Sequence, residues 1–233
     1  YAFIKKKKNS INNLSKKFYY LIYNYKIYMG GIKMTNKDKS IVEISIFTAI
    51  GNLKELEKSV NLGLDNELTV NEIKEIMVQL YAYCGFPRSL NALGVLSNTV
   101  DERKASGKVT EVGRESTPIP SDRNSLVYGT QVQTKIVGME VKGGIYDFAP
   151  MADRYLKAHL FGDIFGQDIL DYRTRELVTV AALASMDGVN PQLQAHIGIS
   201  KNVGVTDDEL NGTIEVLKDK LGFEKANNIK QFL

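Results

Sequence analysis

Two side chains able to exchange protons, Glu176 and His196, stand twenty positions apart in an otherwise aliphatic stretch. From Leu177 the apolar residues recur at i, i+3, i+4 and i+7, so Glu176 opens a helix with one buried face. Residues 187–191, DGVNP, are typical of a turn, and His196 follows on the apolar stripe of the next helix. Antiparallel helices joined by so short a turn could pair the carboxylate with the imidazole for proton transfer. The alternative is a core histidine bonded to the backbone.

The charge distribution sets the first segment apart from the rest of the chain. The 233 residues carry a formal net charge of +3, but residues 1–39 hold ten Lys and one acidic residue, Asp38. The remainder holds 20 basic and 26 acidic groups, which is not the basic footprint of a nucleic-acid-binding protein. We therefore interpret residues 1–35 as a Lys- and Tyr-rich N-terminal extension. Its apolar run, residues 18–29, is too short to span a bilayer, so no membrane span is predicted.

Cysteine and histidine usage narrows the possible chemistry. The single cysteine, Cys84, cannot form an intramolecular disulfide or a Cys-rich zinc site, and two histidines do not favour a His-based metal cage. The sequence also lacks a Gly-rich phosphate-binding loop. We therefore predict no metal and no cofactor, and a lone cysteine is typical of a protein in a reducing cytoplasm.

An all-helical pattern occurs twice in the chain. The first half contains four amphipathic helices with a capping box at Thr69–Glu72, and the same pattern returns 137 residues later without a gap, with a capping box at Thr206–Glu209. This indicates an all-α protein built from tandem duplicated units at residues 36–100 and 151–233. Residues 101–150 are broken by Gly and Pro, and we predict an irregular connector that wraps the body or reaches a neighbouring subunit.

The two copies differ in the residues that carry chemistry. Lys39 stands where the second copy has Glu176, and Ser59 stands where it has His196. The first copy in turn holds an aromatic, thiol and guanidinium set that the second lacks: Tyr81, Tyr83, Cys84 and Arg88. Complementary loss favours one composite site with walls from both units, and neutral drift is the alternative.

The segments RELVTVAALASMDGVNPQLQAHIGISKNVGVTDDEL and YAYCGFPRSLNALGVL resemble the carboxymuconolactone decarboxylase family, which is related to the alkylhydroperoxidase D-like proteins. The resemblance covers essentially residues 36–225 and looks like the tandem-domain branch. It implies the alkylhydroperoxidase D-like fold of helical hairpins and assembly into a homo-oligomer, a trimer or hexamer. It also implies an active cleft between units that takes a small-molecule substrate.

The peroxidase branch of the resembled family uses a Glu, a Cys-x-x-Cys and a His on this hairpin. Glu176 and His196 match that pattern, but Val189 and Gln192 occupy the two cysteine positions. A dithiol cycle needs a second sulfur to resolve the first. A peroxidase would therefore have to use Cys84 alone, and Cys84 also fits a small buried side chain in an apolar helical stripe.

The decarboxylase branch needs no cofactor, and the resemblance then implies roles for particular residues. His196, held by Glu176, would donate a proton, since a nearby carboxylate favours the charged imidazole. Arg88 would orient the substrate carboxylate, with Tyr83 in the binding wall. His159 is a second candidate for substrate binding, or else a packed structural histidine. A non-catalytic ligand-binding oligomer is the remaining alternative.

Overall fold

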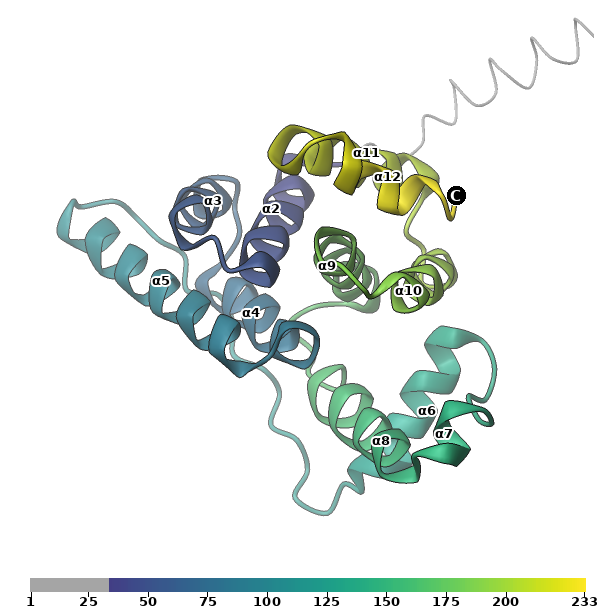
Figure 1. Cartoon of the computed structure of the whole chain (residues 1–233). Coiled ribbons are helices and arrows are strands. Elements are labelled where there is room, and N and C mark those ends of the chain that lie inside the picture. The colour runs from purple at the N-terminus through teal and green to yellow at the C-terminus, as the bar shows by residue number, and fades with distance from the viewer. Residues whose placement is uncertain (1–33) are drawn as a thin grey trace, which may run out of the picture.

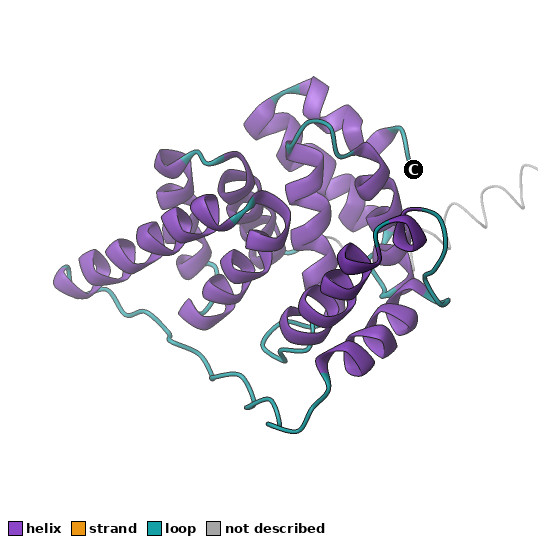
Figure 2. Cartoon of the chain, turned by 60° about the horizontal axis from the view of Figure 1, so that its bottom comes forward, coloured by secondary structure: helices purple, strands orange, loops and turns teal. Residues whose placement is uncertain are grey.

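The computed structural model describes residues 34–233, so nearly all of the predicted N-terminal extension lies outside the described residues. Within this range the chain forms helices and no strand (Figure 2). None of these helices is both long and apolar enough to cross a membrane. The elements in chain order are α2 (Asn36–Ile50), α3 (Leu53–Asp65), α4 (Val70–Cys84), α5 (Phe86–Ala105), α6 (Ser125–Val137), α7 (Ile145–Phe148), α8 (Pro150–Tyr155), the π-helix η1 (Leu156–Ile164), α9 (Tyr172–Ser185), α10 (Asn190–Asn202), α11 (Asp207–Leu221) and α12 (Phe223–Lys230).

The predicted duplication is present in the helix boundaries. α3 and α10, α4 and α11, and α5 and α12 each begin 137 positions apart. Both predicted capping boxes form, with the Thr69 hydroxyl accepting from the Glu72 backbone N–H at 3.2 Å and the Thr206 hydroxyl accepting from Glu209 at the same distance. The fold is therefore all-α, built from two tandem helical-hairpin units.

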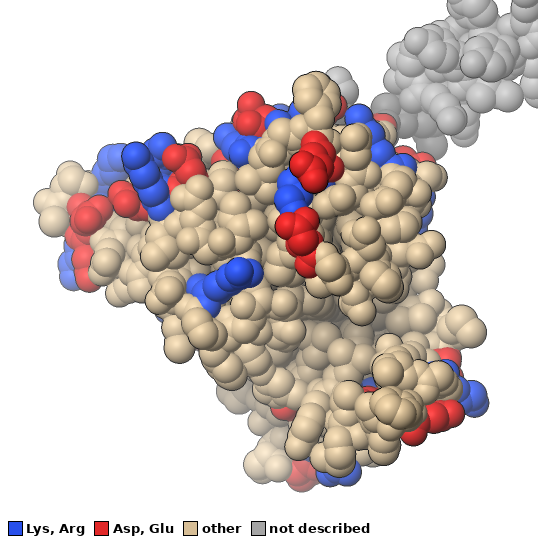
Figure 3. Space-filling view, viewed as in Figure 1, with Lys and Arg blue, Asp and Glu red and all other residues tan. Residues whose placement is uncertain are grey.

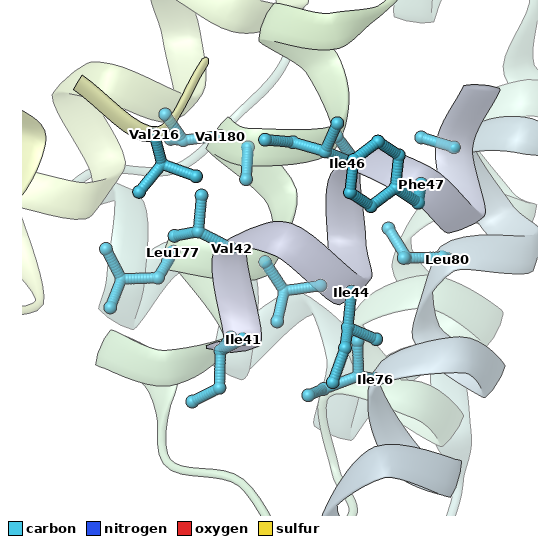
Figure 4. Close-up of a cluster of buried hydrophobic side chains, with 14 of the residues drawn as sticks. Ile41, Val42, Ile44, Ile46, Phe47, Ile76, Leu80, Leu177, Val180 and Val216 are labelled. Atoms are coloured by element: carbon cyan, nitrogen blue, oxygen red, sulfur yellow. The ribbon is translucent and has the colours of Figure 1, made fainter. Parts of the chain in front are cut away.

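The two units share one hydrophobic core rather than folding as separate bodies. α2 of the first unit lies beside α9 of the second in the centre of the molecule (Figure 1). Ile44 and Ile46 of α2 and Leu177 and Val180 of α9 are fully buried in this core (Figure 4). Burying each such side chain typically contributes about 1.5–3 kcal/mol, so the contact between α2 and α9 holds the two copies together.

A buried polar network fixes α4 against α9. The Arg175 guanidinium is fully buried and donates to Glu75 at 2.5 Å and to the Gln79 side-chain oxygen at 2.9 Å. The Gln79 amide in turn donates to the Arg175 carbonyl at 2.9 Å and to the Thr179 hydroxyl at 3.0 Å. Because these groups bond to one another away from water, the register of α4 along α9 is set by directional bonds as well as by packing.

The segment predicted as an irregular connector contains the 13-residue helix α6. Residues 106–124 do run as an extended loop along one side of the molecule (Figure 2). α6 then packs against η1, and together with Ile199 of α10 they form a second, smaller apolar cluster: Val132, Ile136, Leu160, Phe161, Ile164 and Phe165. The helix was not predicted because the Gly and Pro residues on both sides of it suggested an irregular segment throughout.

Gly129 lets α6 approach the backbone of η1 directly. A Cβ at this position would lie 1.8 Å from the Lys157 carbonyl oxygen, which no side-chain rotation can relieve. Gly162 of η1 makes the reciprocal approach, since a Cβ there would lie 2.4 Å from the Ser125 carbonyl oxygen. The position of α6 is therefore set by two backbone surfaces in contact.

We expect Gly129→Ala to destabilise the protein by about 1–3 kcal/mol or more, because the methyl group must push α6 away from η1. Thermal and urea unfolding followed by circular dichroism measure the change. Gly94→Ala is the matched control, because Gly94 is a helical glycine whose added Cβ meets no atom within 4 Å. The control should stabilise the protein by about 0.5–1 kcal/mol through helix propensity. Equal effects from both substitutions would contradict the close approach.

Candidate active site

Glu176 and His196 are in direct contact across the turn between α9 and α10. The His196 Nδ1 lies 2.8 Å from Glu176 Oε2, and Glu176 is fully buried while His196 is 9% exposed. An ionised carboxylate only accepts hydrogen bonds, so Nδ1–H is the donor and Nε2 is the ring nitrogen left for another molecule. The second carboxylate oxygen, Oε1, is buried without a hydrogen-bond partner among residues 34–233. The imidazole is thus the polar group that bonds to this buried charge.

His196 lies in the wall of a cavity of about 600 Å³ between α4, α6, η1 and α10. Figure 3 shows that the centre of this face carries few charged side chains and is recessed between its upper and lower parts. The lining is mostly apolar and includes no Lys, Arg, Asp or Glu: Ala82, Tyr83, Gln133, Val137, Val141, Tyr146, Leu156, Leu160, Phe161, Gln192, Ala195, His196, Gly198, Ile199 and Asn202. Within this lining, the imidazole is the group suited to exchange protons near neutral pH.

The first unit contributes Tyr83 and its neighbour Ala82 to this cavity, and Tyr83 contacts His196. Its ring meets the His196 ring edge-on, with centroids 5.7 Å apart. Its hydroxyl is buried without a hydrogen-bond partner in the described part of the chain. Burial, and then the charge of Glu176, raises the pKa of Tyr83 far above its ordinary value of 10.0. Tyr83 therefore stays a neutral phenol that packs the imidazole in place.

A second cavity of about 610 Å³ lies at the beginnings of α2 and α9. Its charged groups are already paired, with Arg173 bound to Glu209 and 3.2 Å from Asp38. Asp168 is similarly held by the hydroxyl and backbone N–H of Thr117. These contacts join helices and loops, so the cavity beside His196 is the better candidate for chemistry.

The sequence model of the carboxymuconolactone decarboxylase family matches residues 19–98 and 150–233, which is more than half of the chain. The chain belongs to the carboxymuconolactone decarboxylase family. The two matched ranges agree with the two helical units, and the residues between them, including all of α6, are unmatched. Comparison with curated proteins gave no match.

In this member of the carboxymuconolactone decarboxylase family, Cys84 and Arg88 do not line the cavity. The Cys84 thiol donates back to the Leu80 carbonyl of its own helix at 3.1 Å. Burial raises the pKa of Cys84 above its ordinary value of 9.0, and the nearby Arg88 charge offsets this only in part. Arg88 donates to the Ala49 carbonyl at the end of α2, at 2.6 Å. The groups predicted to form one composite site are therefore divided: Tyr83 and His196 line the cavity, whereas Cys84 and Arg88 do not. Arg88 instead has a structural partner.

His159 also lies outside the cavity lining. Its side chain is half-exposed, and Nδ1 lies 3.0 Å from Asp163 one turn further along η1. Its ring packs against Tyr81 of α4 with centroids 5.5 Å apart. These contacts match the alternative of a packed histidine at the junction of α4 and η1.

Two features of the site escaped the sequence analysis. Gln133 and Val137 of α6 form part of the cavity wall, but they lie in the segment predicted as a connector. The small residues Ala195 and Gly198 leave room on the cavity side of α10, a signal visible in the sequence only once the direction of His196 is known. No three His, Cys, Asp or Glu side chains within residues 34–233 are grouped so that they could hold a metal ion.

The state of Cys84 can be tested by alkylation with iodoacetamide. Because burial raises its pKa, the reactive thiolate is scarcer at a given pH than in an ordinary cysteine, and the rate should still be rising above pH 9.0. Intact-mass spectrometry across a pH series measures the rate, and the urea-unfolded chain is the control with an ordinary thiol. A native rate that levels off below pH 8 would contradict this assignment.

Proposed function

We propose that this chain is a cofactor-independent decarboxylase that acts on a small carboxylated lactone or a related acid. The observation that carries the proposal is the 2.8 Å contact between His196 and the buried Glu176 in the wall of an apolar cavity. The pair supplies a proton donor and a charge that stabilises the protonated imidazole. Membership of the carboxymuconolactone decarboxylase family supports the reaction class.

In the proposed reaction the bond between the carboxylate and the ring carbon breaks and releases carbon dioxide. Its electron pair moves into the unsaturated lactone as an enolate, and His196 Nε2–H then delivers a proton to carbon. Glu176 does not line the cavity and acts as a positioning residue that holds the imidazole through Nδ1. Because the lining is mostly apolar, the substrate carboxylate is poorly hydrated in the cavity, which favours its loss as neutral carbon dioxide.

A single-cysteine peroxidase has less support from the same geometry. Attack on a peroxide requires a thiolate, whereas burial raises the pKa of Cys84. Cys84 is also absent from the lining of the cavity that holds His196. We therefore favour proton transfer by the imidazole over thiol chemistry.

His196→Ala should lower kcat for decarboxylation by about 10²–10⁴, the usual contribution of a general acid. Carbon dioxide release from an unsaturated lactone acid measures it. Glu176→Gln keeps the shape of the side chain and a hydrogen-bond acceptor for Nδ1–H but removes the negative charge that stabilises the protonated imidazole. We therefore expect kcat to fall while KM changes little.

Cys84→Ser and incubation with EDTA are the controls, and both should leave decarboxylation intact. Peroxide consumption that is lost with Cys84→Ser and retained with His196→Ala would reverse the assignment in favour of the peroxidase. If Glu176→Gln binds the ligand as tightly as the native protein does, and the native protein turns over no substrate, the non-catalytic binding protein would be favoured.

Gly198→Leu should block the cavity without harming the fold. Gly198 lines the cavity in the middle of α10, and an added Cβ meets no atom within 4 Å. The leucine should raise KM or abolish activity, whereas the melting temperature should stay level or rise because leucine favours helix more than glycine. Gly94→Leu, at an equally open helical glycine outside the cavity lining, is the matched control and should keep full activity. Normal kinetics in Gly198→Leu would place the reaction elsewhere.

A further inference from the structure

One buried amide in the cavity wall has no partner. Gln133 of α6 is only 3% exposed and lines the cavity, yet its side chain makes no hydrogen bond with any residue in the described range 34–233. Gln79, the other buried glutamine, uses both ends of its amide, which donate to α9 and accept from Arg175. Gln133 is not among the residues with fully buried, unpaired polar atoms, so its amide is open to the cavity, where the oxygen of a ligand can bind it.

We propose that Gln133 selects the substrate by donating a hydrogen bond to a carbonyl-type oxygen of a small, largely apolar ring. The oxygen belongs either to the ring lactone or to the carboxylate, which present the same acceptor to an amide N–H. This inference rests on the proposed function, since it concerns the ligand of the same cavity. It assigns substrate recognition to Gln133 and proton transfer to His196.

The other polar side chains in the wall are less able to do this. The lining has no Lys or Arg, so a substrate oxygen must be bound by neutral donors or by the imidazole. Asn202 already donates to the carbonyl oxygens of Ile136 and Val137. Gln192 is exposed at the start of α10, and the Tyr83 hydroxyl is buried out of reach. Tyr146 of α7 is only partly buried, so Gln133 is the buried donor of the wall that remains.

α6 holds this amide in a fixed place. Its contact with η1 is backbone against backbone at Gly129, and its C-terminal carbonyl groups accept from Asn202 of α10. A donor that is already held in position binds its acceptor without the entropy cost of ordering a loop. α6 also lies in the part of the chain that the family match does not cover.

The test measures binding of three unreactive probes to the full-length protein by isothermal titration or ligand-observed NMR. The probes are 5-oxotetrahydrofuran-2-carboxylate, cyclopentanecarboxylate, which lacks the lactone, and γ-butyrolactone, which lacks the carboxylate. They are compared in the native protein, Gln133→Leu and Gln131→Leu. Gln131 is an exposed residue of the same helix outside the cavity lining, so its substitution is the matched control.

Gln133→Leu should lower the affinity for 5-oxotetrahydrofuran-2-carboxylate about tenfold, as expected for loss of one hydrogen bond, while Gln131→Leu should leave it unchanged. If Gln133 binds the ring oxygen, γ-butyrolactone weakens as well and cyclopentanecarboxylate does not. If Gln133 binds the carboxylate, the affinity for cyclopentanecarboxylate falls and the affinity for γ-butyrolactone does not. The melting temperature of Gln133→Leu should not fall, because the unpaired amide is removed.

Unchanged or tighter binding of all three probes by Gln133→Leu would overturn the inference, and so would a native protein that binds none of them. Turnover is measured separately with His196→Ala. Turnover that depends on His196 alongside unaffected binding in Gln133→Leu means that the proposed function stands and this inference fails. Weakened binding in Gln133→Leu without any turnover by the native protein means that this inference stands and the proposed function fails.

Discussion

A fully buried guanidinium joins the two helical units, and the geometry of the cavity depends on it. Arg175 of α9 bonds to a carboxylate and to the Gln79 amide of α4. Removing one partner of a buried charge pair typically costs about 3–5 kcal/mol, so α4 cannot slide along α9. Glu176 follows Arg175 directly, and Tyr83 lies one turn beyond Gln79. The bonds that join the units therefore also set the phenol ring against His196.

The duplicated position in the first unit shows what makes the second one chemically different. Ser59 stands at the position of His196 and donates to Glu43 at 3.3 Å. Lys220 stands at the position of Tyr83 and reaches the same carboxylate at 3.4 Å. An arrangement of hydroxyl, carboxylate and ammonium has a fixed ion pair but lacks an imidazole. The related helical frames thus hold an ion pair between the two units at one place and a carboxylate–imidazole pair within the second unit at the other.

Local patterns in the sequence predicted the helices, their caps and the repeat, and the short turn made contact between Glu176 and His196 one of two interpretations. They did not predict direction around a helix. Cys84 follows the tyrosine that meets the imidazole, but successive helical residues point about 100° apart, and its thiol bonds back to its own helix. Nor could they predict α6, because Gly129 has meaning only once the backbone of η1 passes beside it. Gln133 was therefore beyond the reach of periodicity.

The proposed proton donor and the proposed substrate-binding amide lie in different segments of this chain. The acid–base pair lies within the second unit, where the buried carboxylate holds the imidazole by a single hydrogen bond. The lining of the cavity adds no fixed charge of its own, and in so apolar a setting the charge of the pair acts on a ligand with little screening. α6 is attached by backbone contacts, by its apolar cluster with η1 and by Asn202, and the Gln133 amide on its cavity-facing side takes part in none of these. A substitution on that face can therefore change which molecule is bound while the proton donor stays where it is.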